Sequence, residues 1–83
     1  MEEAKKERIK KTLTEIAEAK NNGEFSDLYD FEVTEDKDGF IVLIDKTEES
    51  YYESWMLKDF NKAVEAEGCY LECECPGRYI VAE

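Results

Sequence analysis

The sequence predicts a two-layer α+β fold, in which two helices pack on one face of a four-stranded antiparallel sheet. Two stretches, residues 2–20 and 50–67, carry apolar residues at helical spacing. Each stretch is followed by two short β-favouring segments joined by a turn that contains glycine. The expected order is therefore α-β-β-α-β-β, in a single acidic domain that spans residues 1–83.

The first predicted helix covers residues 2–20. Charged residues separate its apolar positions, which fall near helical spacing: Ala4, Ile9, Leu13, Ile16 and Ala17. The sequence Asn21-Asn22-Gly23 follows. It predicts the end of the helix, because Gly and Asn readily adopt the left-handed conformation that caps helices.

The first predicted hairpin spans residues 30–44. Phe31 and Val33 alternate with polar residues in the strand 30–35. Residues 36–39 form the turn, in which Gly39 can take a positive φ angle. Residues 40–44 are apolar on both faces, which is typical of a strand in the centre of a sheet.

The second predicted helix covers residues 50–67. Ser50 and Glu53 have the spacing of a capping box, and Gly68 marks the end of the helix. The expected buried stripe combines aromatic and aliphatic residues at helical spacing: Tyr52, Met56, Phe60, Ala63 and Val64.

The last two predicted strands are residues 69–75 and 78–82, joined by the turn Pro76-Gly77. The second and fourth strands are the most apolar, so we expect them in the centre of the sheet. The first and third strands then lie at the edges. The sheet order 1-2-4-3 makes every neighbouring pair antiparallel.

All three cysteines, Cys69, Cys73 and Cys75, belong to the third predicted strand. Strand alternation places them on the same face as Leu71, which predicts reduced thiols buried under the helices. A zinc site is the alternative, but structural zinc needs four nitrogen or sulfur ligands. The chain has no histidine and no second cysteine cluster, so we expect no metal and no cofactor.

The chain is strongly acidic, with 22 acidic and 11 basic residues and a net charge of −11. Residues 1–20 hold six bases and five acids, so residues 21–83 hold five bases and 17 acids. This acidity excludes nucleic-acid binding through phosphate neutralisation. No run of about 20 apolar residues predicts a membrane span. The first residues lack the apolar core of a signal peptide, so we expect a cytoplasmic protein.

The negative charge is expected to surround the sheet face that points away from the helices. If Phe31, Val33 and Leu71 point inward, their neighbours in the two edge strands point outward. An apolar centre rimmed by charge of one sign is typical of a protein-binding surface. The candidate partner-binding residues are Asp30, Glu32, Glu35, Asp36, Asp38, Tyr70, Glu72 and Glu74.

These features predict a non-enzymatic inhibitor that binds a basic protein, such as a nuclease or an RNA-guided effector. Carboxylates would take the place of phosphates, and aromatic side chains the place of bases, in the partner's nucleic-acid groove. In size and acidity the chain is similar to anti-CRISPR, anti-restriction and nuclease-immunity proteins. This likeness is one of general character and is carried by no sequence motif.

The alternative is a structural or adaptor module, either a homodimer that pairs through the open sheet face or a designed αβ scaffold. In that case the acidity serves solubility. Catalysis is not expected, because the chain lacks histidine, the commonest acid–base group. Glu72 and Glu74 flank Cys73, and negative neighbours disfavour a reactive thiolate.

Overall fold

The computed structural model of the chain describes residues 1–24, 29–46 and 57–83. It confirms the predicted α+β class and the order of helices and strands. The elements are α1 (Glu3–Asn21), β1 (Phe31–Glu35), β2 (Ile41–Asp45), α2 (Lys58–Glu65), β3 (Tyr70–Cys75) and β4 (Arg78–Ala82).

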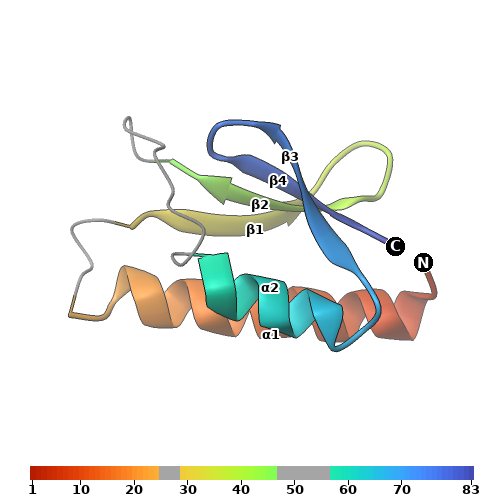
Figure 1. The fold of residues 1–83 in the computed structure, drawn as a ribbon, viewed down its shortest axis with the longest axis horizontal. Coiled ribbons are helices and arrows are strands. Elements are labelled where there is room, and N and C mark those ends of the chain that lie inside the picture. Colours follow the sequence, from red (N-terminus) through yellow and green to blue (C-terminus); the bar gives the residue numbers. More distant parts are fainter. Residues whose placement is uncertain (25–28, 47–56) are drawn as a thin grey trace.

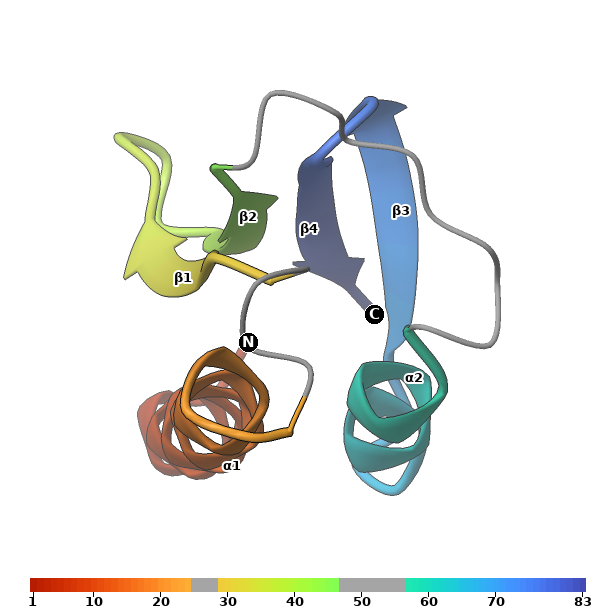
Figure 2. The same ribbon diagram turned by 90° about the vertical axis from the view of Figure 1, so that its left-hand side faces the viewer.

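The four strands form one antiparallel sheet in the predicted order β1-β2-β4-β3 (Figure 1). Both helices lie on the same side of it, α1 beneath β1 and α2 beneath β3 (Figure 2). The other side of the sheet, which we call the open face, carries neither helix. Among the described residues no helix is long and apolar enough to cross a membrane.

The core lies between the sheet and the two helices. Ile9, Leu13 and Ala17 are spaced by four residues along α1 and are all buried. Phe60 and Val64 supply the buried side of α2. The sheet contributes the inward residues of all four strands, of which Phe31, Ile41, Leu43 and Val81 are buried.

Aromatic packing links the first edge strand to the second helix. The rings of Phe31 and Phe60 have their centroids 4.9 Å apart with an interplanar angle of 60°. Such edge-to-face pairs add stabilisation beyond the apolar area that they bury. The ring of Tyr29 stacks on that of Phe31, with the centroids 5.4 Å apart.

The turn glycines behave as predicted, since Gly39, Gly68 and Gly77 all have positive φ angles of 85°, 76° and 84°. In the first turn the Asp36 carboxylate accepts hydrogen bonds from the backbone N–H groups of Asp38 and Phe40, both at 2.9 Å. After α2, the N–H groups of Gly68 and Cys69 bond back to Glu65 and Val64, which closes the helix end.

The end of α1 differs from the prediction, because neither Asn22 nor Gly23 has a positive φ angle. The backbone N–H of Asn22 donates to the carbonyl of Glu18 at 3.1 Å, and side-chain amides add further hydrogen bonds here. The Asn22 amide donates to the carbonyl of Glu18 at 2.8 Å. The Asn21 amide donates to the carbonyl of Phe31 at 2.9 Å and accepts from the N–H of Phe31 at 2.8 Å. This pair of bonds fastens the end of α1 to the free edge of β1.

Only part of the predicted second helix lies among the described residues. Within the described residues α2 begins at Lys58 and ends at Glu65, two residues before the predicted end. Phe60 and Val64 are buried and Ala63 packs against the core, as predicted for the stripe. The capping box at Ser50 and the remaining predicted stripe positions, Tyr52 and Met56, lie outside the described residues.

Candidate protein-binding face

The open face is ordered in rows, because directly paired residues of neighbouring strands point to the same side of a sheet. The central row is apolar in the middle and polar at both ends: Thr34, Val42, Ile80 and Glu72. Val42 is fully buried, and Ile80 is half-buried. The centre of this row is therefore apolar but little exposed, and Glu72 lies at its β3 edge.

Two exposed aromatic side chains lie outside the central row. Tyr70 of β3 is paired with Ala82 of β4. Phe40 lies one residue before β2 and beyond the last paired residues of β2 and β4, Val42 and Ile80. Phe40 and Tyr70 are 47% and 52% exposed, so two large apolar side chains stand in solvent at this end of the face.

A second row, at the opposite end, is polar and charged: Glu32, Ile44, Arg78 and Cys75. Glu32 pairs with Lys46 at 3.0 Å, and this hydrogen bond raises the pKa of the Lys46 ammonium. Glu74 pairs with Arg78 at 2.8 Å. Two of the predicted partner-binding acids, Glu32 and Glu74, are thus partly neutralised by nearby bases. The sequence pattern did not predict these ion pairs.

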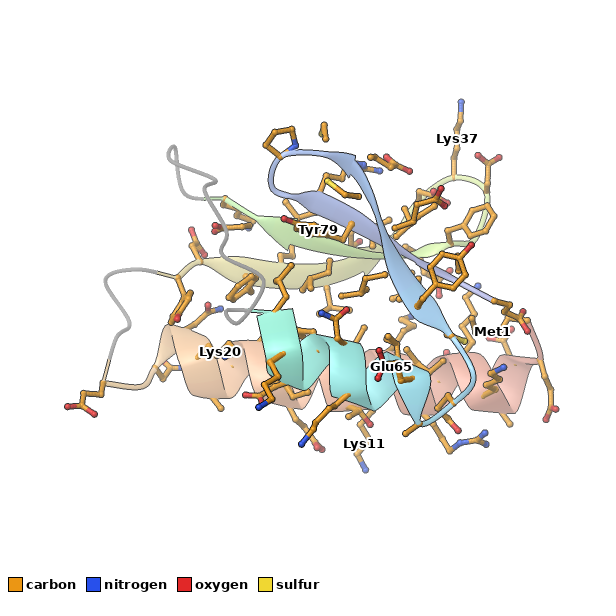
Figure 3. All side chains as sticks on the ribbon, in the orientation of Figure 1. Met1, Lys11, Lys20, Lys37, Glu65 and Tyr79 are labelled. Atoms are coloured by element: carbon orange, nitrogen blue, oxygen red, sulfur yellow. The ribbon has the colours of Figure 1, made fainter. Side chains whose placement is uncertain are left out.

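The remaining predicted residues divide between the face and its surroundings. Glu72 is exposed and makes no ion pair with any described residue, and Asp30 and Asp38 are also exposed. The Asp36 carboxylate is used within the turn. Figure 3 shows Lys37 projecting from the same turn, away from the helices, so one base lies between Asp36 and Asp38.

Glu35 lies on the helix side of the sheet. It is paired with the inward-facing Ile41, and its carboxylate contacts Lys10 at 2.8 Å and Lys6 at 3.2 Å. The hydrogen bonds from Lys10 and Lys6 lower the pKa of the Glu35 carboxyl group. Glu35 therefore joins β1 to α1 and does not contribute to the open face.

The prediction that all three thiols are buried is wrong. Cys69 is buried, but Cys73 and Cys75 are exposed, and all three are free. A bulge breaks the alternation: Cys73 is paired with the inward-facing Tyr79, and Cys75 with Arg78 on the open face. Cys73 still faces the helix side, yet α2 does not cover it.

Among the described residues no group of three or more His, Cys, Asp or Glu side chains is placed to hold a metal ion.

The bases of α1 pair with acids from other elements around the helix side. Arg8 contacts Glu67 at 2.9 Å, Lys20 contacts Asp59 at 3.5 Å, and Lys5 contacts Glu83 at 3.4 Å. These partners are far apart in the sequence, so the uneven charge of residues 1–20 and 21–83 did not predict the ion pairs. The bases of α1 neutralise acids on the helix side of the sheet. The acids of the open face are too far from these bases to pair with them.

No protein-family model, curated protein or solved structure matches the chain. Its function must therefore be argued from the open face itself. The face has the features of a protein-binding surface: an apolar centre, exposed aromatic side chains and a charged rim.

Proposed function

We propose that the chain is a non-enzymatic inhibitor that binds a basic protein through its open face and occupies a groove that otherwise binds nucleic acid. The observation that carries this proposal is the open face, with the exposed Phe40 and Tyr70 and with Glu72, which makes no ion pair with any described residue, in a chain of net charge −11. The partner class is that of nucleases and RNA-guided effectors, so the inhibitor would be of the anti-CRISPR, anti-restriction or nuclease-immunity type.

Electrostatics favours this kind of partner. Concentrated charge of one sign raises the association rate with a groove of opposite sign and specifies orientation. The groove of a nucleic-acid-binding protein offers both the basic residues and the surfaces on which bases stack. Exposed Tyr70 and Phe40 supply the stacking groups, and Glu72, Asp30 and Asp38 supply negative charge.

The chemistry of the chain favours binding over catalysis. It contains no histidine to act as a general base near neutral pH. The exposed thiols Cys73 and Cys75 stand on either side of Glu74, a negative neighbour that does not favour a thiolate.

A homodimer through the open face is the second candidate, and the exposure of Phe40 and Tyr70 favours it. Salt separates the two. A homodimer brings like charges together, so added salt should strengthen it, whereas salt should weaken a complex with a basic partner. Light scattering coupled to size-exclusion chromatography at low and high salt measures the first effect directly.

The proposal is tested by charge reversal at matched sites. Glu72→Lys changes the open face, and Glu18→Lys makes the same charge change at an exposed position on α1. Used as baits in lysates rich in nucleases and RNA-guided effectors, the wild type and Glu18→Lys should retain the same basic partner. Glu72→Lys should lower its association rate by roughly tenfold.

Competition then tests the groove. The purified partner should bind its DNA or RNA poorly once this chain is attached. If the partner binds nucleic acid equally well with the chain attached, or if Glu18→Lys weakens the complex as much as Glu72→Lys, the proposed mode of inhibition is wrong.

A further inference from the structure

The sheet ends in two edge strands, β1 and β3, and hydrogen bonds in the structure show where the backbone groups of each strand point. In an antiparallel strand the N–H and the carbonyl of one residue point to the same side, and successive residues alternate. Both groups of Phe31 bond to the side chain of Asn21, so they point away from β2. Asp45, the partner of Phe31, must then bond to β4, and its N–H does donate to the carbonyl of Gly77 at 2.8 Å.

The same alternation fixes the bonding directions at β3. On β4 it directs the backbone of Tyr79 toward β2 and that of Ile80 toward β3. Glu72, the partner of Ile80, therefore bonds within the sheet. The N–H and carbonyl groups of its neighbours Leu71 and Cys73 point away from β4. Among the described residues they bond to no backbone group outside the sheet, and we call them the β3 edge.

The side chains along the β3 edge differ between the two sides of the sheet. On the open face Tyr70 and Glu72 are exposed, and Glu72 makes no ion pair with any described residue. On the helix side Leu71 is half-buried and Cys73 is exposed. A strand added here would set its own side chains alternately beside these two pairs. A basic side chain suits the side of Glu72, and an apolar one suits the side of Leu71.

A second copy of the chain suits the β3 edge poorly. Each copy carries a net charge of −11. Two β3 edges paired about Glu72 would set the two Glu72 carboxylates directly opposite each other, and like charges in this position destabilise a strand pair. Charge complementarity therefore favours a basic occupant.

We propose that the β3 edge binds an extended segment of the partner protein, with alternating basic and apolar residues, as a fifth antiparallel strand. This inference rests on the proposed function, because it requires a basic partner. Main-chain hydrogen bonds to Leu71 and Cys73 provide affinity, and the alternate side chains provide specificity. Antiparallel pairing continues the pattern of the whole sheet.

The test compares two methylated forms of the peptide acetyl-Lys-Val-Lys-Val-Lys-Val-Lys-amide in binding to the full chain at low salt. When the lysines lie on the side of Glu72 in an antiparallel strand, the valine N–H groups face β3 and the lysine N–H groups face solvent. Methylation of the valine nitrogens should weaken binding about tenfold relative to the unmethylated peptide. Methylation of as many lysine nitrogens keeps the charge and should change binding by less than about twofold.

A variant of the chain tests the same bonds from the other side. Cys73→Pro removes an outward N–H and no bond to β4, and proline is tolerated on edge strands. It should weaken binding of the unmethylated peptide about tenfold, whereas Cys73→Ala should bind as the wild type does.

Hydrogen exchange of the wild type needs no variant. In the free chain the N–H groups of Leu71 and Cys73 should exchange fast and that of Glu72 slowly, because only Glu72 is bonded within the sheet. Addition of the unmethylated peptide should slow the exchange of Leu71 and Cys73.

The outcomes separate the fifth strand from the proposed function. Equal binding of the two methylated peptides, or a greater loss from lysine methylation, would contradict the antiparallel strand. Slow exchange of Leu71 and Cys73 in the free chain would show that the β3 edge is already bonded. Self-association that Cys73→Pro abolishes would assign the edge to a second copy and contradict the basic occupant. The proposed function fails separately, if the partner binds its nucleic acid equally well with this chain attached.

Discussion

The two edge strands of the sheet look alike in sequence and differ in the structure. In both, inward apolar residues alternate with outward residues that include an acid, Glu32 on β1 and Glu72 on β3. On β1 the inward Phe31 is buried against Tyr29 and Phe60, and Glu35 is held by Lys6 and Lys10. On β3 the inward Leu71 is half-buried and the inward Cys73 is exposed.

Among the described residues, the two edge strands differ in the length of the helix that lies beneath them. The 19-residue helix α1 lies along β1, whereas α2 has eight residues within the described part of the chain, beneath the six-residue strand β3. The side chain of Asn21 also occupies the N–H and the carbonyl of Phe31, so part of the β1 edge is already bonded. Alternation decides which side of a sheet a residue faces. The extent of the second layer decides whether facing inward means burial.

The largest expected contrast in unfolding free energy is between truncations of one inward residue on each edge strand. Phe31→Ala removes a buried ring and should cost about 3–5 kcal/mol of unfolding free energy. Cys73→Ala removes an exposed group and should change it by no more than about 0.5 kcal/mol. Urea unfolding of both variants measures the contrast. Similar losses at the two positions would mean that the edges are covered alike.

The next prediction concerns the two hydrogen bonds that join the end of α1 to β1. Asn21→Ala leaves the N–H and the carbonyl of Phe31 without their side-chain partner, and should cost about 1–3 kcal/mol. Asn22→Ala is the matched control, because its amide bonds only to the exposed end of its own helix. We expect a change within about 0.5 kcal/mol there. An equal loss for the two asparagines would show that the bonds to Phe31 are unimportant.

A smaller, pH-dependent effect is expected at Glu35. Its pKa is lowered in the folded chain by the hydrogen bonds from Lys10 and Lys6. A lowered folded pKa means that the ion pairs stabilise the fold above the unfolded pKa, and that this stabilisation is lost as the pH falls through the folded value. Glu35→Gln should therefore lower the melting temperature at pH 7, with the difference from the wild type shrinking below about pH 4.

Glu72→Gln serves as the control for that experiment, since Glu72 is exposed and unpaired among the described residues. Its melting temperature should follow the wild type at every pH. A constant difference for Glu35→Gln between pH 3 and pH 7 would argue against a role for the ionised carboxylate.

The last contrast involves no change in stability. Cys73 and Cys75 should react quickly with a thiol reagent in the native protein, and Cys69 only as the fold opens. Ellman titration should give two fast equivalents and one slow one, with all three fast in denaturant. Slow reaction of all three thiols would restore the expectation of a fully buried set.

Much of the fold could be predicted from local patterns. The helical spacing of Ile9, Leu13 and Ala17 identified the buried side of α1, and the glycines at 39 and 77 identified both hairpin turns. The contrast between apolar and alternating strands was enough for the order β1-β2-β4-β3. These features depend on residues that are close in sequence, which is why the chain alone displays them.

The candidate face was predictable in outline, because alternation correctly directed Glu32, Tyr70 and Glu72 away from the helices. The details of the face could not be predicted from the sequence. The row that sets Val42 beside Ile80 and Glu72 depends on the registers of two strand pairs. The pairing of Glu74 with Arg78 depends on the geometry of the second hairpin.

By itself, the sequence determined the class, the order of the elements and an excess of negative charge. The tertiary structure alone decided which charges are neutralised and which thiols are covered. Lys10 and Glu35 are 25 residues apart in the chain and 2.8 Å apart in space. Contacts of this kind arise only when the layers pack, and a single bulge at Glu74 is enough to turn Cys75 to the opposite face. Periodicity describes one strand or helix at a time, whereas burial and ion pairing depend on what the neighbouring element brings to the same place.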